Sequence, residues 1–155
     1  MAAFEYRQAV EIRDAFRRHG VEYLFIGKAG AILLGFPDTT QDADLFVKKS
    51  ASNCELLLRA LADLGFQFSE QQTQEILRGK VLIRLKNGAF DVNLTFAPDG
   101  IETFEDAWKR HVDVEGFPVC HIDDIIQSKQ AANRRKDRES LPRLLSFRKW
   151  LAKGG

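Results

Sequence analysis

The stretch GKAGAILLGFPDTTQDADLF, residues 27–46, combines a Gly-Lys pair, a short apolar run and two aspartates one residue apart. The preceding VEYLFI is β-branched and aromatic enough for a buried strand, and Gly27 fits a tight turn into a short helix. A second strand is predicted over residues 43–47. Because strand residues alternate between the faces of a sheet, Asp42 and Asp44 should point the same way.

The Gly-Lys pair does not form a Walker phosphate-binding loop. That loop requires G-x-x-x-x-G-K-[ST], whereas here the first glycine position holds Glu22 and the residue after Lys28 is Ala29. What remains is a glycine turn at the start of a helix, where backbone N–H groups attract anions and phosphate can approach closely. The alternative is that Gly27 only forms the turn and Lys28 is solvated.

A β-hairpin is predicted by VLIRLKNGAFDVNL, residues 81–94, where Asn87-Gly88 joins two strand-like runs. A two-residue turn predicts the cross-strand pairs Lys86–Ala89, Leu85–Phe90, Arg84–Asp91 and Ile83–Val92. One face would be apolar and turned to the core, and it consists of Ile83, Leu85, Phe90, Val92 and Leu94. The opposite, polar face would carry Arg84, Asp91 and Asn93.

Three carboxylates on neighbouring strands would suit a divalent cation. Side-by-side carboxylates repel each other unless they share a cation, and Mg²⁺ prefers such hard oxygen ligands together with phosphate oxygens. Asp42, Asp44 and Asp91 could therefore hold two magnesium ions for an in-line nucleotidyl transfer. The alternative is a solvated edge for the first two aspartates and a cross-strand ion pair between Asp91 and Arg84.

The rest of the chain mixes helical and strand-like patterns. Residues 4–19 have an apolar stripe at helical spacing that ends at Gly20. Ser52 and Glu55 have the spacing of a capping box before a leucine-rich run closed by Gly65.

The final third begins with HVDVEGFPVCHI, which suggests a strand pair near Gly116. From about Asp123 the pattern is helical to the end, with a bend or break near Pro142. This order predicts an α/β or α+β fold, a mixed β-sheet with flanking helices and a helical C-terminal part from about residue 122. Residues 1–155 fit a single domain.

Composition excludes several function classes. Hydrophobic residues make up 45% of the sequence, charged residues 29%, and the formal net charge of +1 gives no global basic field for nucleic acid. Cys54 and Cys120 lack the spacing of a metal site and are expected as reduced thiols. No apolar run is long enough to span a membrane, and charges occupy the place of a signal-peptide core, so we expect a cytoplasmic location.

Taken together, these motifs resemble the nucleotidyltransferase superfamily related to DNA polymerase β, in particular its small "minimal" and abortive-infection-type members. That family's pattern is an apolar strand, Gly-[Gly/Ser], a short helix, Gly-x-x-Arg-x-Thr-x-Asp-x-Asp and a third Asp on a later strand. The matching residues here are Gly27, Gly35, Thr40, Asp42, Asp44 and Asp91. The segment DDIIQSKQAANRRKD is similar to a later family segment, through Lys129, Arg134, Lys136 and Asp137.

The sequence departs from this pattern at two positions, which bear on activity rather than on the fold. Lys28 replaces the second Gly or Ser, where it could meet a phosphate directly or obstruct its approach. Asp38 replaces the usual Arg, which removes a cation and adds an anion near the predicted metal site.

The C-terminal segment is locally basic, and on one continuous helix Lys129, Asn133 and Lys136 would share a face. That stripe could meet a triphosphate or an RNA backbone. The alternative is a solvated face of an amphipathic helix, with Ile122, Ile125, Ile126 and Leu144 on its apolar side.

The resemblance implies an enzyme, a magnesium-dependent nucleotidyltransferase that moves a nucleoside monophosphate from an NTP such as ATP to a hydroxyl of a protein, RNA or small molecule. Asp42, Asp44 and Asp91 would be the metal ligands and catalytic residues, with Asp91 also the candidate base. The nucleotide-binding residues would be Gly27, Lys28, Thr40 and Lys129. The competing hypotheses are a catalytically degenerate binding module of the same fold, such as a toxin–antitoxin component, and a plain RNA-binding protein.

Overall fold

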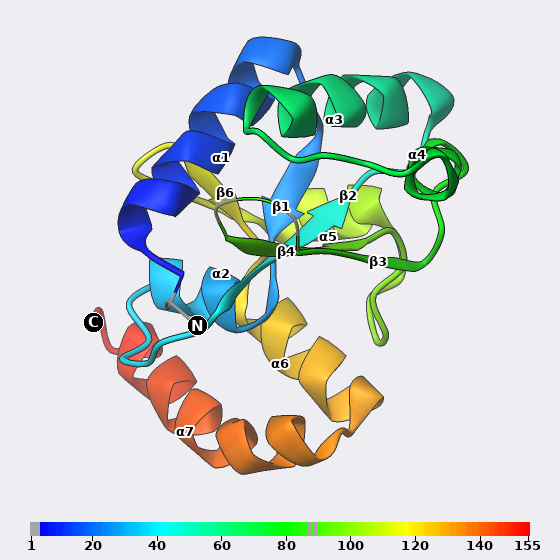
Figure 1. The fold of residues 1–155 in the computed structure, drawn as a ribbon. Helices are drawn as coiled ribbons and strands as arrows, with labels where there is room; N and C mark the ends of the chain where they lie inside the picture. Colours follow the sequence, from blue (N-terminus) through cyan, green and yellow to red (C-terminus); the bar gives the residue numbers. More distant parts are fainter. Residues whose placement is uncertain (1–3, 87, 89) are drawn as a thin grey trace.

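The computed structural model describes residues 4–86, 88 and 90–155 (Figure 1). In this part of the chain the elements, in order, are α1 (Tyr6–His19), β1 (Tyr23–Phe25), α2 (Gly27–Leu33), β2 (Asp42–Val47), α3 (Ala51–Asp63), α4 (Glu70–Leu77), β3 (Leu82–Leu85), β4 (Asp91–Thr95), α5 (Phe104–Arg110), β5 (Val112–Val114), β6 (Phe117–Val119), α6 (Ile122–Ala132) and α7 (Arg135–Ala152).

The strands form one mixed sheet in the order β3-β4-β2-β1-β6-β5. β2 runs parallel to β4 and β1 runs parallel to β6, whereas β1–β2, β3–β4 and β5–β6 are antiparallel. The predicted α/β (α+β) class, with a mixed sheet, flanking helices and a helical C-terminus, is confirmed.

Helices cover both faces of the sheet: α1 and α3 lie over one, and α2, α6 and α7 over the other (Figure 1). On β2, the fully buried Ala43, Leu45 and Val47 alternate with Asp42 and Asp44. The apolar set therefore faces α1 and α3, and the two aspartates face α2 and the C-terminal helices.

The predicted hairpin register is wrong by two residues. β3 and β4 are antiparallel, but Leu85 lies opposite Val92 and Arg84 opposite Asn93 rather than Asp91. β3 ends at Leu85 and β4 begins at Asp91, so Phe90 lies outside the strand pairing; its buried ring is 5.7 Å from that of Phe4 and 5.6 Å from that of Phe66. A shift of two residues preserves the faces, so the predicted core face is confirmed.

Two predictions made for this hairpin lie outside the described residues. They are the Asn87 half of the turn and the Lys86–Ala89 pair.

Helix boundaries follow the capping chemistry. The N-cap of α3 is Ser50, which accepts a hydrogen bond from the Asn53 backbone N–H, so the predicted cap at Ser52 is wrong. Two short helices not predicted from the sequence, α4 and α5, have Ser69 and Thr103 as their N-caps, and the hydroxyl of each cap accepts a hydrogen bond from the backbone N–H three residues later.

The break in the C-terminal helical region falls at Asn133, not near Pro142. Asn133 has φ +49°, a left-handed conformation that asparagine tolerates, and it ends α6, whereas α7 continues through Pro142. Lys129 and Lys136 consequently lie on different helices, and the predicted continuous face is wrong. The predicted apolar side is confirmed, since Ile122, Ile125, Ile126 and Leu144 are buried.

Two expectations from composition concern the cysteines and membrane-spanning segments. Cys54 and Cys120 are free and buried. None of the helices in the described part has the length and apolarity that crossing a membrane requires.

Leu94 tests the core assignment of the hairpin. Its side chain is fully buried and lies opposite both Ile83 and Leu45, so Leu94→Ala should lower the free energy of unfolding by about 2–5 kcal/mol in urea titrations. The matched control is Leu82→Ala on β3, which is 42% exposed and should cost less than about 1 kcal/mol. Equal losses in both variants would contradict the described register.

Candidate functional site

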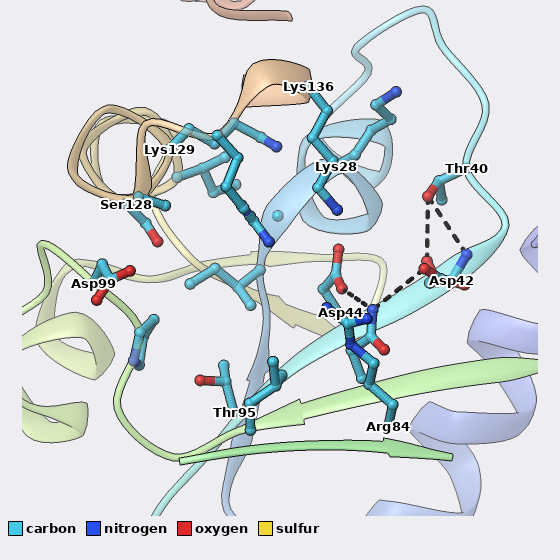
Figure 2. A pocket seen from close by; sticks show the side chains of 18 of the residues that line it. Lys28, Thr40, Asp42, Asp44, Arg84, Thr95, Asp99, Ser128, Lys129 and Lys136 are labelled. Atoms are coloured by element: carbon cyan, nitrogen blue, oxygen red, sulfur yellow. Dashed lines mark hydrogen bonds between the residues drawn. The ribbon is translucent and has the colours of Figure 1, made fainter. Parts of the chain in front are cut away.

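A cavity of about 520 Å³ lies between the polar face of the sheet and helices α6 and α7 (Figure 2). Its volume is in the range of sites for small molecules and cofactors. Of the seven residues predicted for the site, six line this cavity: Gly27, Lys28, Thr40, Asp42, Asp44 and Lys129. The seventh, Asp91, is not part of the lining.

Asp42 and Asp44 point to the same side of β2, and an amide joins them. The Asn93 Nδ2 donates to Asp44 Oδ1 at 2.9 Å and to Asp42 Oδ2 at 3.3 Å (Figure 2). In the parallel pairing of β2 with β4, Asp91 lies opposite Asp42 and Asn93 lies opposite Asp44. The sequence pattern predicts Asn93 on the polar face of its strand but does not indicate a site role for it, because nothing local shows which residue of β4 lies opposite Asp44.

Gly27 is required by Asp44. Its φ of +65° is in the left-handed region, and a Cβ at this position would come within 2.5 Å of Asp44 Oδ2. The Ile26 backbone N–H donates to the Asp44 carbonyl at 2.9 Å, which fixes the end of β1 against β2. The glycine turn therefore makes room for the carboxylate.

The carboxyl of Asp44 is in a poorly solvated position. Burial raises its pKa above the ordinary value, and the negative charge of Asp42 acts in the same direction. The hydrogen bond from Asn93 and the charges of Lys129 and Lys136 oppose this shift without cancelling it. The fold thus holds a carboxylate whose charged form burial disfavours.

Cations from the C-terminal helices face the two aspartates. Figure 2 shows the side chains of Lys129 (α6) and Lys136 (α7) pointing toward Asp44. Lys129 is only 9% exposed, and burial lowers its pKa despite the nearby carboxylates of Asp137 and Asp44.

Asp137 joins the two helices beneath these lysines. Its fully buried carboxylate accepts from Lys129 Nζ at 3.4 Å, from the Arg134 backbone N–H at 3.1 Å and from Arg134 Nε at 2.8 Å. Burial raises the pKa of Asp137, but the hydrogen bonds from Arg134 and the charge of Lys129 outweigh it, and the pKa lies below the ordinary value. A charged Asp137 therefore fixes Lys129 at the cavity wall.

Thr40 supports the start of β2. Its hydroxyl makes two long hydrogen bonds with the backbone of Asp42, at 3.4 and 3.5 Å, and its carbonyl accepts from the Phe4 backbone N–H at 2.6 Å. Its contacts within the protein are therefore with the backbone that carries the aspartates.

The two residues that depart from the family pattern contact each other. Lys28 Nζ lies 3.2 Å from Asp38 Oδ2, and Arg143 Nη1 on α7 donates to the same oxygen at 3.1 Å. The extra anion at position 38 is therefore neutralised by two cations.

The donor set of the cavity fits one magnesium ion. Asp42 and Asp44 present carboxylate oxygens side by side, and Mg²⁺ is commonly held by one or two carboxylates, waters and substrate phosphates. Among the described residues, no three acidic, histidine or cysteine side chains come together to hold a metal. A second ion would need a third carboxylate beside these two, and the remaining carboxylate of the lining, Asp99, is not grouped with them.

The fold is similar to that of known nucleotidyltransferases, although no family model and no curated protein sequence matches the chain. The lincomycin-bound lincosamide antibiotic adenylyltransferase LnuA has a TM-score of 0.65 at 14% identity, over 94% of this chain and 99% of that one. A Thermotoga maritima protein, provisionally assigned as a nucleotidyltransferase, has a TM-score of 0.58 at 20% identity, over 95% and 92%. The predicted nucleotidyltransferase fold is confirmed.

Replacing Gly27 tests its dependence on Asp44. Gly27→Ala should lower the free energy of unfolding by the strain of a left-handed alanine, about 1–2 kcal/mol, plus at least about 1 kcal/mol for the clash with the carboxylate. The matched control is Gly20→Ala, because Gly20 has φ +72° and no atom within 4 Å of the added methyl. Equal losses in the two variants, measured by urea unfolding, would rule out a steric role for Asp44.

Replacing Asp44 tests the effect of burying its charge. A folded-state pKa above the unfolded value means that the ionised carboxyl opposes folding at neutral pH, so Asp44→Asn should raise the free energy of unfolding at pH 7. The gain should shrink as the pH falls toward the raised pKa, because protonation removes the same charge from the wild type. A variant less stable than wild type at pH 7 would show that the lysines stabilise the charge more than burial opposes it.

Proposed function

We propose that this chain, which has the nucleotidyltransferase fold, binds a nucleoside triphosphate with magnesium and transfers the nucleoside monophosphate to a hydroxyl group. The observation that carries the proposal is the opposition of charges across one cavity, with Asp42 and Asp44 on the sheet and Lys129 and Lys136 on the helices. Carboxylates suit a hard cation, and lysines suit a polyphosphate.

Each group would have a separate task. Asp42 and Asp44 would hold magnesium, which when bound would neutralise phosphate charge and polarise the reacting phosphate. Asn93 would orient both carboxylates through its amide. Lys129, fixed by Asp137, and Lys136 would bind and orient the polyphosphate. Gly27 and Thr40 would border this part of the site.

The transfer itself exchanges one bond for another. The acceptor hydroxyl oxygen bonds to the α-phosphorus, the bond from that phosphorus to the α,β-bridging oxygen breaks, and pyrophosphate leaves. We propose that Asp91, opposite Asp42 in the strand register, takes the hydroxyl proton as general base. In this role it would act on an acceptor that reaches past the cavity lining to the start of β4.

The substrates are proposed from the fold neighbours and from the cavity. One neighbour is named as an adenylyltransferase, which supports ATP as the donor, and its antibiotic substrate supports a small molecule among the three predicted acceptor classes. The Arg84 and Lys86 side chains and the exposed Leu82 of the β3 edge also line the cavity and would contact such an acceptor.

A second candidate function is nucleotide binding without transfer, as in a degenerate module of a toxin–antitoxin pair. It is favoured by the position of Asn93, an amide directly beside Asp44, and by the place of Asp91 outside the cavity lining. The two functions differ in product formation, not in binding.

Calorimetric titration with ATP and magnesium tests the proposal. Wild type should bind one ATP, and Asp42→Asn and Asp44→Asn should each lose at least about tenfold in the magnesium-dependent part of the affinity, because each removes one carboxylate ligand. Asp91→Asn is the matched control, which should bind ATP as wild type does and lose transfer of labelled nucleotide to an acceptor.

The outcomes separate the alternatives. Absence of nucleotide binding by the wild type would refute the proposed function. Metal-dependent binding that never yields a labelled product across protein, RNA and small-molecule acceptors would establish the second candidate instead. Loss of ATP binding in Asp91→Asn would make that residue a ligand rather than a base.

A further inference from the structure

Lys28 lines the cavity, but its side chain points away from Asp44. It extends from the first turn of α2 and lines the cavity, yet Figure 2 shows its amine away from Asp44, while Lys129 and Lys136 point toward that residue. Its amine instead lies 3.2 Å from Asp38 Oδ2, in the loop between α2 and β2. In the described part of the chain, Asp38 is the one acidic residue that forms an ion pair with Lys28.

The carboxylate of Asp38 has hydrogen-bond donors other than Lys28. The Thr39 backbone N–H donates to Asp38 Oδ1 at 2.7 Å, and Arg143 Nη1 donates to Oδ2 at 3.1 Å. Arg143 is itself fixed, because Nη2 donates to the Pro37 carbonyl at 2.9 Å and the guanidinium lies 5.0 Å from the centre of the Phe36 ring. The carboxylate would therefore stay hydrogen-bonded if Lys28 moved away.

This asymmetry makes Lys28 the movable member of the pair. Its side chain is one-third exposed, and a lysine amine on a flexible four-carbon stem has three donors that can be redirected at little cost. A polyphosphate in the cavity would carry several negative charges, against the single charge of Asp38.

We propose that Lys28 rests on Asp38 in the free protein and transfers to a bound polyphosphate, so that Asp38 acts as a built-in competitor that sets the affinity of the site. The inference rests on the proposed function for the identity of the ligand, since it takes the triphosphate of that function as the competing anion. The same proposal gives one explanation for both departures from the family pattern, Lys28 and Asp38.

The proposal predicts a specific non-additivity. Removing the Asp38 charge should free Lys28 and tighten polyphosphate binding, whereas removing the Lys28 charge should weaken it. With Lys28 gone there is nothing left for Asp38 to compete for, so the gain from Asp38→Asn should disappear in the Lys28→Gln background. A general field effect of the lost negative charge would instead persist in that background.

The experiment is a double-mutant cycle measured by calorimetric titration with inorganic triphosphate, without metal and at low ionic strength. The proteins are wild type, Asp38→Asn, Lys28→Gln and the double variant. Asp38→Asn should bind roughly two- to fivefold tighter than wild type, which corresponds to one surface ion pair. Lys28→Gln should bind roughly five- to tenfold weaker, and the double variant should match it within about twofold. Repulsion from Asp42 and Asp44 is common to all four proteins and cancels.

A control variant isolates the field effect. Asp99 also lines the cavity, and the described residues show no ion pair for it, so any gain from Asp99→Asn should be the same with and without Lys28. Urea unfolding of every variant confirms that the comparison is made between folded proteins.

Three results would overturn the inference: no triphosphate binding by wild type, wild-type affinity in Lys28→Gln, or an equal gain from Asp38→Asn in both backgrounds. The proposed function is decided separately, by magnesium-dependent ATP binding and transfer. Coupling between Lys28 and Asp38 toward triphosphate without such transfer would keep this inference and refute the enzyme. Nucleotide transfer without coupling between Lys28 and Asp38 would keep the enzyme and refute this inference.

Discussion

The carboxylate of Asp44 lies against the backbone of Gly27, so closely that a methyl group there would come within 2.5 Å of Oδ2. The rest of the site depends on this contact. Gly27 begins α2 two residues after the end of β1 at Phe25, while Asp44 lies on β2, the antiparallel neighbour of β1. Because Gly27 has no side chain, Asp44 on β2 can lie on the sheet surface that faces α2, α6 and α7. The glycine and the aspartate therefore work as one structural unit.

The cavity concentrates groups that a stable fold would otherwise avoid. Asp44 with its raised pKa, the mostly buried Lys129 and the left-handed turn at Gly27 all line the same cavity. Asp137, itself held by Arg134, accepts a hydrogen bond from that lysine, and Asn93 donates to both aspartates, so the buried charged groups have partners. Buried charges and unfavourable backbone conformations that occur together, each with compensating contacts, are characteristic of functional sites.

Lys28 and Asp38 show how a tertiary contact changes the meaning of single positions. Compared with the family pattern one residue at a time, each substitution weakens the case for activity. In the fold the two side chains are 3.2 Å apart and Arg143 completes the charge balance. The overall likeness to solved nucleotidyltransferases, at 14% and 20% identity, concerns the arrangement of elements and leaves room for such local exchanges.

The sequence by itself determined what depends on local pattern. Alternation placed Asp42 and Asp44 on one face, helical spacing and Gly20 bounded the first helix, and the two hairpin strands showed their core face. It could not determine the hairpin register, because a shift of two residues leaves every side chain on the same face of the sheet.

Only the tertiary structure decided how distant segments meet. β2 pairs with β4, a strand far along the chain, and that pairing puts Asn93 rather than Asp91 beside Asp44. The left-handed turn at Asn133 separates the helices that carry Lys129 and Lys136, and the packing of these helices under the sheet brings both lysines back to one cavity. Contacts between segments so far apart are set by packing and strand order, to which no local spacing of residues corresponds.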